Sequence, residues 1–186
     1  MSKPNSDKFW LEPLLLQAFQ KLYKNDSYLI EHGEEYFLPE ENIDKTIGNK
    51  SYHVSERGIV FKFGVYLQEI ANCDERLRNY DIDIEYNRKG NDQKKVGAEN
   101  VCPDLIIHKR GHQEDNLLVI EFKPHWNDER SEDIKKLCGF IEPPYKYENA
   151  LSVLIGISEP KLDWVSNKTK GKEGQKKLKA RDGDNE

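Results

Sequence analysis

The chain lacks most of the motifs that mark metal-binding, secreted and membrane proteins. Its three cysteines form no CxxC pair, and its five histidines form no zinc-ligand pattern, so a zinc site is not expected. No apolar run is long enough to span a membrane. The sequence also contains no glycine-rich phosphate loop, GxSxG motif, internal repeat or heptad array. These absences remove several common enzyme and repeat classes.

The N-terminal region contains only a short apolar run, at residues 14–16, and Glu12 and Gln17 bracket it closely. This pattern predicts no secretory signal. Three scattered cysteines also fit a reducing compartment, so we expect a cytoplasmic protein with no membrane partner. The length of 186 residues suits one domain with a sizeable core, although 36% hydrophobic and 34% charged residues make the chain polar.

Charge is distributed unevenly along the chain. The formal net charge of −5 is not typical of a general nucleic-acid binder, because phosphate neutralisation uses a basic surface. Between Lys161 and Arg181, however, the chain contains eight lysine and arginine residues and only two acidic residues, Asp163 and Glu173. This tail could hold a nucleic-acid backbone or could be a solvated, disordered terminus, and composition leaves both open.

The most informative segment spans residues 103–123. Strand-forming residues fill positions 104–108 and 117–123, and residues 111–116 between them are turn-like. The pattern predicts two adjacent antiparallel strands. Glu121 and Lys123 then share one face with Leu117 and Val119, and strand pairing can bring Asp104 beside them.

These residue types suit metal chemistry. Two carboxylates, Asp104 and Glu121, can hold a divalent cation, with further oxygen ligands from a backbone carbonyl and water. An ammonium at Lys123 can orient a water nucleophile or stabilise charge that develops on a phosphate. Two of these residues also have a plainer explanation: Asp104 could start a strand at a turn, and Lys123 could be an exposed strand end. Glu121 is harder to explain in this way, because its strand face begins apolar and ends in an acid and a lysine.

With Pro103-Asp104 followed by Glu121-Phe122-Lys123, the segment resembles the signature of the PD-(D/E)xK nuclease superfamily, the restriction-endonuclease-like phosphodiesterases. As a bare pattern the motif is weak, so the flanking elements matter. Upstream, Ser55 can cap a helix that runs to about Asn72. Its apolar stripe consists of Ile59, Val60, Phe63, Leu67 and Ile70.

Glu56 lies at the N-terminal end of that inward stripe. Superfamily members often carry a glutamate on the helix before the core sheet, so the resemblance implies that Glu56 joins the metal shell. The alternative is a first-turn glutamate that stabilises the helix dipole and points to water.

The order of the other elements agrees with the resemblance. Residues 80–86 alternate as a strand, residues 131–141 form an amphipathic helix, and residues 151–157 form an apolar strand. Helix, three strands, helix, strand is the order of a restriction-endonuclease-like core. We therefore expect an α/β fold with a mixed sheet flanked by helices. The expected division is an N-terminal helical extension over 1–50, with a helix at 8–23, a nuclease-like core over 51–160, and a basic, flexible tail over 161–186.

Several further residues carry weaker indications. Asp83 and Glu85 could extend the acidic site, although a solvated strand face is at least as well supported. Lys136 could touch a phosphate, in a pattern with Asp133 and Leu137 that also resembles the superfamily, but a surface lysine is the favoured interpretation. A structural role is likewise favoured for His108, and a packing role for Trp126.

The resemblance implies metal-dependent phosphodiester hydrolysis of nucleic acid, with DNA favoured over RNA and endonuclease over exonuclease action. Asp104 and Glu121 would bind Mg²⁺ or Mn²⁺, Glu56 would support the metal shell, and Lys123 would assist attack by water. The main alternative is a nucleic-acid-binding or assembly module that shares the fold without cutting. A protein-interaction domain with an acidic surface would follow if Asp104 and Glu121 lay far apart.

Overall fold

The computed structural model describes residues 7–31, 54–112, 114–127 and 129–166. Along the chain the elements are α1 (Asp7–Asn25), α2 (Tyr28–Glu31), α3 (Glu56–Ala71), β1 (Asp81–Ile84), β2 (Arg88–Lys89), β3 (Asp92–Gln93), β4 (Lys95–Val96), β5 (Glu99–Asn100), β6 (Leu105–His108), β7 (Asn116–Pro124), α4 (Ser131–Ile141), β8 (Asn149–Ile155) and β9 (Pro160–Val165). The helices expected near 8–23, 55–72 and 131–141 are all present.

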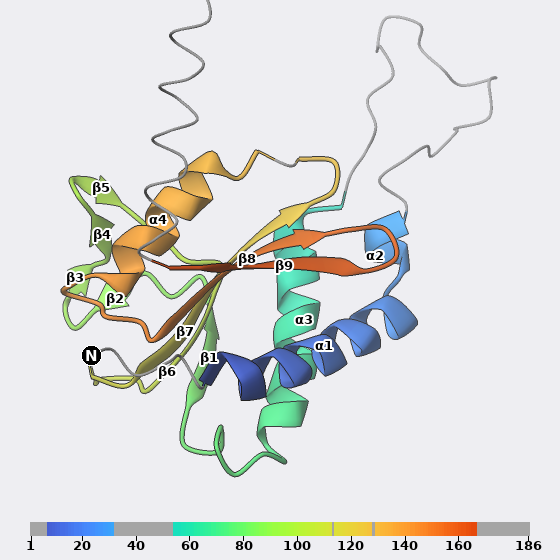
Figure 1. Ribbon diagram of the computed structural model, residues 1–186, viewed down its shortest axis with the longest axis horizontal. Helices are drawn as coiled ribbons and strands as arrows, with labels where there is room; N and C mark the ends of the chain where they lie inside the picture. Colours follow the sequence, from blue (N-terminus) through green and yellow to red (C-terminus); the bar gives the residue numbers. More distant parts are fainter. Residues whose placement is uncertain (1–6, 32–53, 113, 128, 167–186) are drawn as a thin grey trace, which may run out of the picture.

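Five strands form one mixed sheet in the order β1-β6-β7-β8-β9 (Figure 1). The β1–β6, β6–β7 and β8–β9 pairs are antiparallel, whereas β7 and β8 are parallel. A parallel pair needs a crossover, and α4 supplies it between β7 and β8. The expected α/β fold with a mixed sheet and flanking helices is therefore confirmed. Residues 88–100 add two short hairpins, β2–β3 and β4–β5, outside this sheet.

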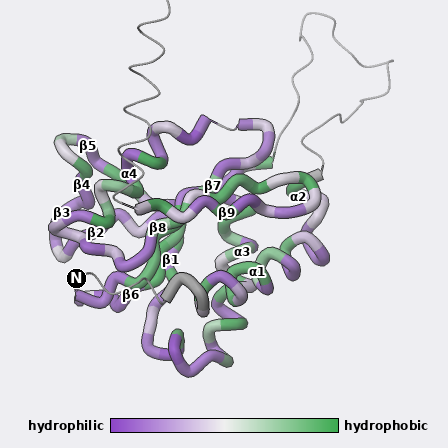
Figure 2. Tube along the Cα trace, in the orientation of Figure 1, coloured by the Kyte–Doolittle hydropathy of each residue, from purple (hydrophilic) through white to green (hydrophobic). Residues whose placement is uncertain are grey.

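The helices lie on opposite faces of the sheet. Figure 1 shows α1 and α3 together on one side and α4 with the short hairpins on the other. Figure 2 shows hydrophobic residues along the central strands and mostly hydrophilic residues in the hairpin region. Strand alternation produces this arrangement, because neighbouring residues of a buried strand serve opposite layers.

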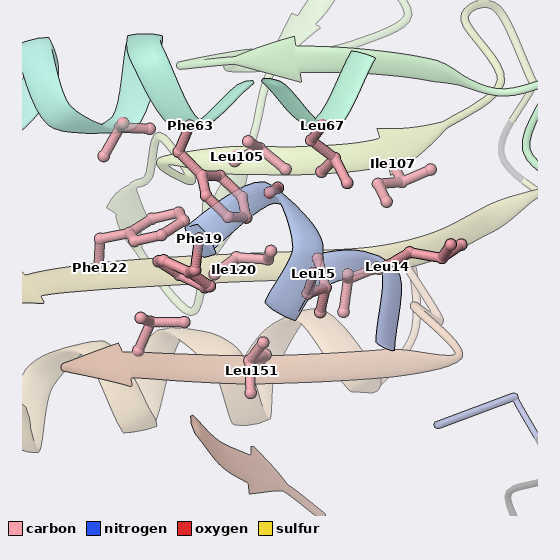
Figure 3. Packing of buried hydrophobic residues seen from close by; sticks show 14 of the residues in the cluster. Leu14, Leu15, Phe19, Phe63, Leu67, Leu105, Ile107, Ile120, Phe122 and Leu151 are labelled. Carbon is pink, nitrogen blue, oxygen red and sulfur yellow. The ribbon is translucent and has the colours of Figure 1, made fainter. Parts of the chain in front are cut away.

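The first core layer lies between the sheet and the pair α1 and α3 (Figure 3). The Phe63 ring packs 4.4 Å from the Phe19 ring and 5.2 Å from the Phe122 ring, measured between centroids, so three elements meet at one aromatic contact. Gly64 lets α3 approach β1, because an added Cβ would lie 2.8 Å from Ile84 Cδ1. α1 thus belongs to the same hydrophobic core as α3 and the sheet.

The second core layer lies between the sheet and α4. Its buried residues include Ile106 of β6, Val119 of β7 and Leu137 of α4. At Gly139, a Cβ would come within 2.4 Å of Val96 Cγ1, so the glycine allows the β4–β5 hairpin to pack closely on α4. The sheet face under α4 also carries the candidate site residues Glu121 and Lys123, which lie beyond the apolar part of this layer.

Two expectations, one about the C-terminal tail and one about Leu117, were wrong. Residues 160–165 form the edge strand β9, so five residues that we assigned to the basic tail belong to the sheet. Leu117 does not share a face with Val119, because the β6–β7 register shifts beside it and Leu117 packs in the α1–α3 layer. Residues 167–186 of the expected tail and the expected boundary at residues 50 and 51 lie outside the described residues.

Within the part of the chain that the structure describes, no helix combines the length and apolar character needed to cross a membrane.

Lys94, between the two short hairpins, is an unusual buried lysine. Its side chain is almost fully enclosed, Nζ donates to the Tyr86 carbonyl at 3.0 Å, and the ammonium lies 4.7 Å from the centre of the Tyr86 ring. Burial lowers the pKa of Lys94 to about 8. The charged form is therefore less favourable in the folded protein than in the unfolded chain.

We expect Lys94→Met to alter the pH dependence of stability. Between about pH 8 and 10 the unfolded wild type binds more protons at this position than the folded wild type, so its free energy of unfolding should rise by roughly 2 kcal/mol. Lys94→Met should lack this rise. Urea unfolding at several pH values measures the free energy of unfolding. The control is Lys95→Met, which changes the exposed neighbouring lysine. Parallel pH profiles in wild type and Lys94→Met would contradict the assignment.

Candidate functional site

Asp104 immediately precedes β6 and lies against β7. The register pairs Leu105 with Ile120, which places Asp104 next to the following β7 residues. Its Oδ2 accepts a hydrogen bond of 2.7 Å from the Phe122 backbone N–H, between Glu121 and Lys123. Burial, with the neighbouring Glu56 carboxylate, raises the pKa of Asp104 to about 6 although the Phe122 N–H opposes the shift. The fold thus brings Asp104 and the Glu121-Phe122-Lys123 segment together.

Glu121 is the most deeply buried acid of the group. The residue is 2% exposed, and its Oε1 has no hydrogen-bond partner among the described residues. Its Oε2 lies 3.6 Å from Lys136 Nζ. Burial first and the Asp104 carboxylate second raise the pKa of Glu121 well above its usual value. A buried carboxylate oxygen without a hydrogen-bond partner destabilises the folded state unless a ligand binds to it.

Lys123 stands between two acids from different helices. Its Nζ is 3.2 Å from Asp133 Oδ2 on α4 and 3.7 Å from Glu56 Oε2 on α3. Burial alone would lower the pKa of Lys123, but the Asp133 and Glu56 carboxylates raise it overall. Lys123 is therefore a fixed ammonium at neutral pH, and the alternative of an exposed strand end is wrong.

Glu56 is the first residue of α3 and does point toward the site, as the inward stripe predicted. Its side chain is 28% exposed and pairs with Lys123. Burial is the main reason that the pKa of Glu56 is raised, and Asp133 adds to it, while Lys123 opposes it. The neighbouring Arg57 turns away and pairs with Glu85 at 2.6 Å. Glu56 thus contacts the lysine, and its role in a metal shell stays a prediction.

Two residues of α4, Asp133 and Lys136, join the site, although a surface lysine was the favoured interpretation of Lys136 from the sequence. Asp133 is 3% exposed, and its Oδ1 accepts a 3.0 Å hydrogen bond from Lys136 Nζ. Lys136 Nζ also lies 3.6 Å from Glu121 Oε2. Its side chain is partly exposed, as expected for a surface lysine, but it also pairs with two buried acids, and a contact with phosphate stays a prediction. Helical spacing held a signal for both: Asp133 lies four residues before buried Leu137, and Lys136 follows Asp133 by three. A buried acid in a first turn needs a partner.

The other acidic candidates do not join the site. Asp83 accepts hydrogen bonds from His108 Nε2 at 2.8 Å and from Arg110, and Glu85 pairs with Arg57. Burial lowers the pKa of His108, although Asp83 opposes the shift. The structural role expected for His108 is confirmed. Trp126 packs against the α1–α3 core layer, which confirms its packing role.

The site gathers Glu56, Asp104, Glu121 and Asp133 around the ammonium groups of Lys123 and Lys136. Among the described residues, no group of three or more His, Cys, Asp or Glu side chains is placed to hold a metal ion by itself. The donors that fit a cation are the adjacent carboxylates of Asp104 and Glu121, because Glu121 Oε1 is unpartnered and these oxygens are hard ligands. Remaining ligands would have to come from backbone carbonyls, water or substrate.

Comparison with protein-family models, curated proteins and solved structures finds no match to this chain.

Proposed function

We propose that this protein is a metal-dependent phosphodiesterase of the PD-(D/E)xK type that hydrolyses nucleic acid, with DNA as the favoured substrate. The observation that carries the proposal is the buried, unpartnered Oε1 of Glu121 beside Asp104, with the Lys123 ammonium adjacent on the same strand. The element order of the sheet and helices supports it, because it agrees with the order that the sequence resemblance implies.

Asp104 and Glu121 are the residues that would hold Mg²⁺ or Mn²⁺. When bound there, such an ion would polarise a phosphoryl oxygen and lower the pKa of water. Asp104 is already oriented by the Phe122 N–H, and Glu121 is held in the sheet, so neither carboxylate has to be ordered on binding. The two acids are also close enough to raise the pKa of Glu121, which a cation would reverse.

Lys123 is proposed to act on the reacting water or phosphate. Its ammonium stays protonated because Asp133 and Glu56 hold it, and the same two acids restrain its position from opposite helices. A fixed positive charge stabilises a phosphate whose negative charge increases during hydrolysis. Water is the nucleophile, so no covalent intermediate with the protein is required.

A second candidate is a nucleic-acid-binding or assembly module of the same fold that does not cut. The pairing of Lys136 with Glu121 favours it, because an internal ammonium already compensates the buried acid. The absence of a three-residue metal group among the described residues also favours it. The two candidates differ in whether a divalent cation binds and whether bonds are broken.

The deciding experiment is a cleavage assay with purified full-length protein. Single-stranded, duplex and branched DNA, and RNA, are incubated with Mg²⁺ or Mn²⁺, and parallel samples receive a chelator. We expect cleavage of DNA that stops when the chelator removes the metal. If none of these substrates is cut in either metal, the non-cleaving module becomes the better description.

A further inference from the structure

Lys136 occupies an unusual position for a helix lysine. Its Nζ lies 3.0 Å from Asp133 Oδ1 and 3.6 Å from Glu121 Oε2. Both acids are nearly enclosed, whereas the Lys136 side chain is 36% exposed. The counter-ion of the buried Glu121 is therefore a lysine whose side chain is partly exposed.

The acidic groups around Lys136 outnumber the basic ones, so a divalent cation would be attracted to this site. Among the described residues, the four carboxylates of Glu56, Asp104, Glu121 and Asp133 are compensated by the two ammonium groups of Lys123 and Lys136. Lys136 uses Glu121 Oε2, while Oε1 of the same carboxylate remains unpartnered. A divalent cation held by Asp104 and Glu121 would share the Glu121 carboxylate with the Lys136 ammonium, and two positive charges on one buried carboxylate repel each other.

We infer that Lys136 is an internal counter-ion that a divalent cation displaces from Glu121, and that Asp133 positions the displaced ammonium. This inference rests on the proposed metal site, in which Lys136 would compete with the metal ion for the Glu121 carboxylate. Metal affinity is set by this exchange as well as by the ligands.

Asp133 suits the anchoring role because it precedes Lys136 by one helical turn on α4. The bond between them is shorter than the contact with Glu121, and it does not depend on how the helix sits on the sheet. Asp133 also pairs with Lys123, so one buried carboxylate connects both ammonium groups. When Lys136 leaves Glu121, its partly exposed side chain can turn toward solvent and keep the Asp133 contact.

The test is the affinity of the full-length, chelator-treated protein for Mn²⁺ alone, measured by titration calorimetry without nucleic acid. Lys136→Met keeps the apolar stem and removes the charge, and it should tighten Mn²⁺ binding on the order of tenfold. Lys136→Arg keeps the charge and should bind like wild type. The matched control is Lys135→Met on the same helix, whose exposed lysine pairs with Glu132. It should change the affinity by less than about twofold, because solvent screens surface charges.

Tighter binding in Lys136→Met cannot arise from structural damage, because damage to the site would weaken binding. Equal or weaker Mn²⁺ binding in Lys136→Met, with wild type binding normally, overturns the inference and leaves the proposed function standing. No Mn²⁺ binding by wild type overturns the proposed function and the inference together. Circular dichroism melting checks folding, and if Lys136→Met does not fold, Lys136→Gln decides by the same criterion.

Discussion

Replacing Glu121 or Lys123 with alanine should reduce DNA cleavage in Mg²⁺ by about a hundredfold or more, the scale seen when one preorganised electrostatic contact is removed from an active site. The two variants should fail for different reasons. Glu121→Ala removes a metal ligand, so it should also weaken Mn²⁺ binding measured by calorimetry. Lys123→Ala removes an ammonium, which repels cations, so it should cleave poorly while binding the metal at least as well as wild type.

Two further variants make this experiment specific. Lys123→Arg should not restore full cleavage, because a planar guanidinium does not reproduce a compact ammonium held between Asp133 and Glu56. Glu132→Ala is the control, because Glu132 is an exposed acid on α4 that pairs with Lys135. It should cleave at the wild-type rate. Cleavage that persists in Glu121→Ala would assign the activity to a contaminant or to another site.

The buried carboxylate of Asp104 should make the chelator-treated protein less stable as pH rises. Asp104 has a pKa of about 6 in the folded protein, above the usual value of 3.8, so the folded state binds the proton more tightly than the unfolded state. Its contribution to stability is present below about pH 4 and is lost as pH rises through 6. The loss should be roughly 3 kcal/mol at pH 8 for this single group.

Asp104→Asn should therefore raise stability at pH 8 without metal and lose that part of the pH dependence. An asparagine oxygen can still accept the Phe122 N–H, so the substitution removes charge with little change in shape. Mg²⁺ should then raise the melting temperature of wild type, because an ion bound only by the folded state stabilises it, and should raise that of Asp104→Asn or Asp104→Ala much less.

Thermal melting at pH 4, 6 and 8, with and without Mg²⁺, measures both effects. The control is Asp115→Asn, at a partly exposed acid that pairs with Lys109 at 3.1 Å. Its variant should follow the wild-type profile. An Asp104→Asn protein that is less stable than wild type at pH 8 and responds equally to Mg²⁺ would count against the site.

The elements that local patterns determine were predictable from the sequence. α4 begins and ends where its amphipathic pattern does, at Ser131 and Ile141. Glu121 and Lys123 lie under α4, as two-residue alternation from Val119 requires. Side-chain direction within one strand or helix depends only on the geometry of that element, so spacing is sufficient to predict it.

Long-range packing decided the rest. Sequence alone did not indicate β9, whose pairing with β8 depends on a neighbouring strand, or the shift that turns Leu117 to the other core layer. Helical spacing indicated that Asp133 lies on the buried side of α4 and that Lys136 follows it by one turn, but their contacts with Lys123 and Glu121 depend on how α4 packs on the sheet, which no local pattern reports. The motif could thus predict that two acids and a lysine meet. Only the tertiary structure could show that Lys136 pairs with Glu121 and that Asp133 contacts both lysines. It also decides the desolvation that raises the pKa of Asp104 and Glu121, because burial is a property of the whole fold.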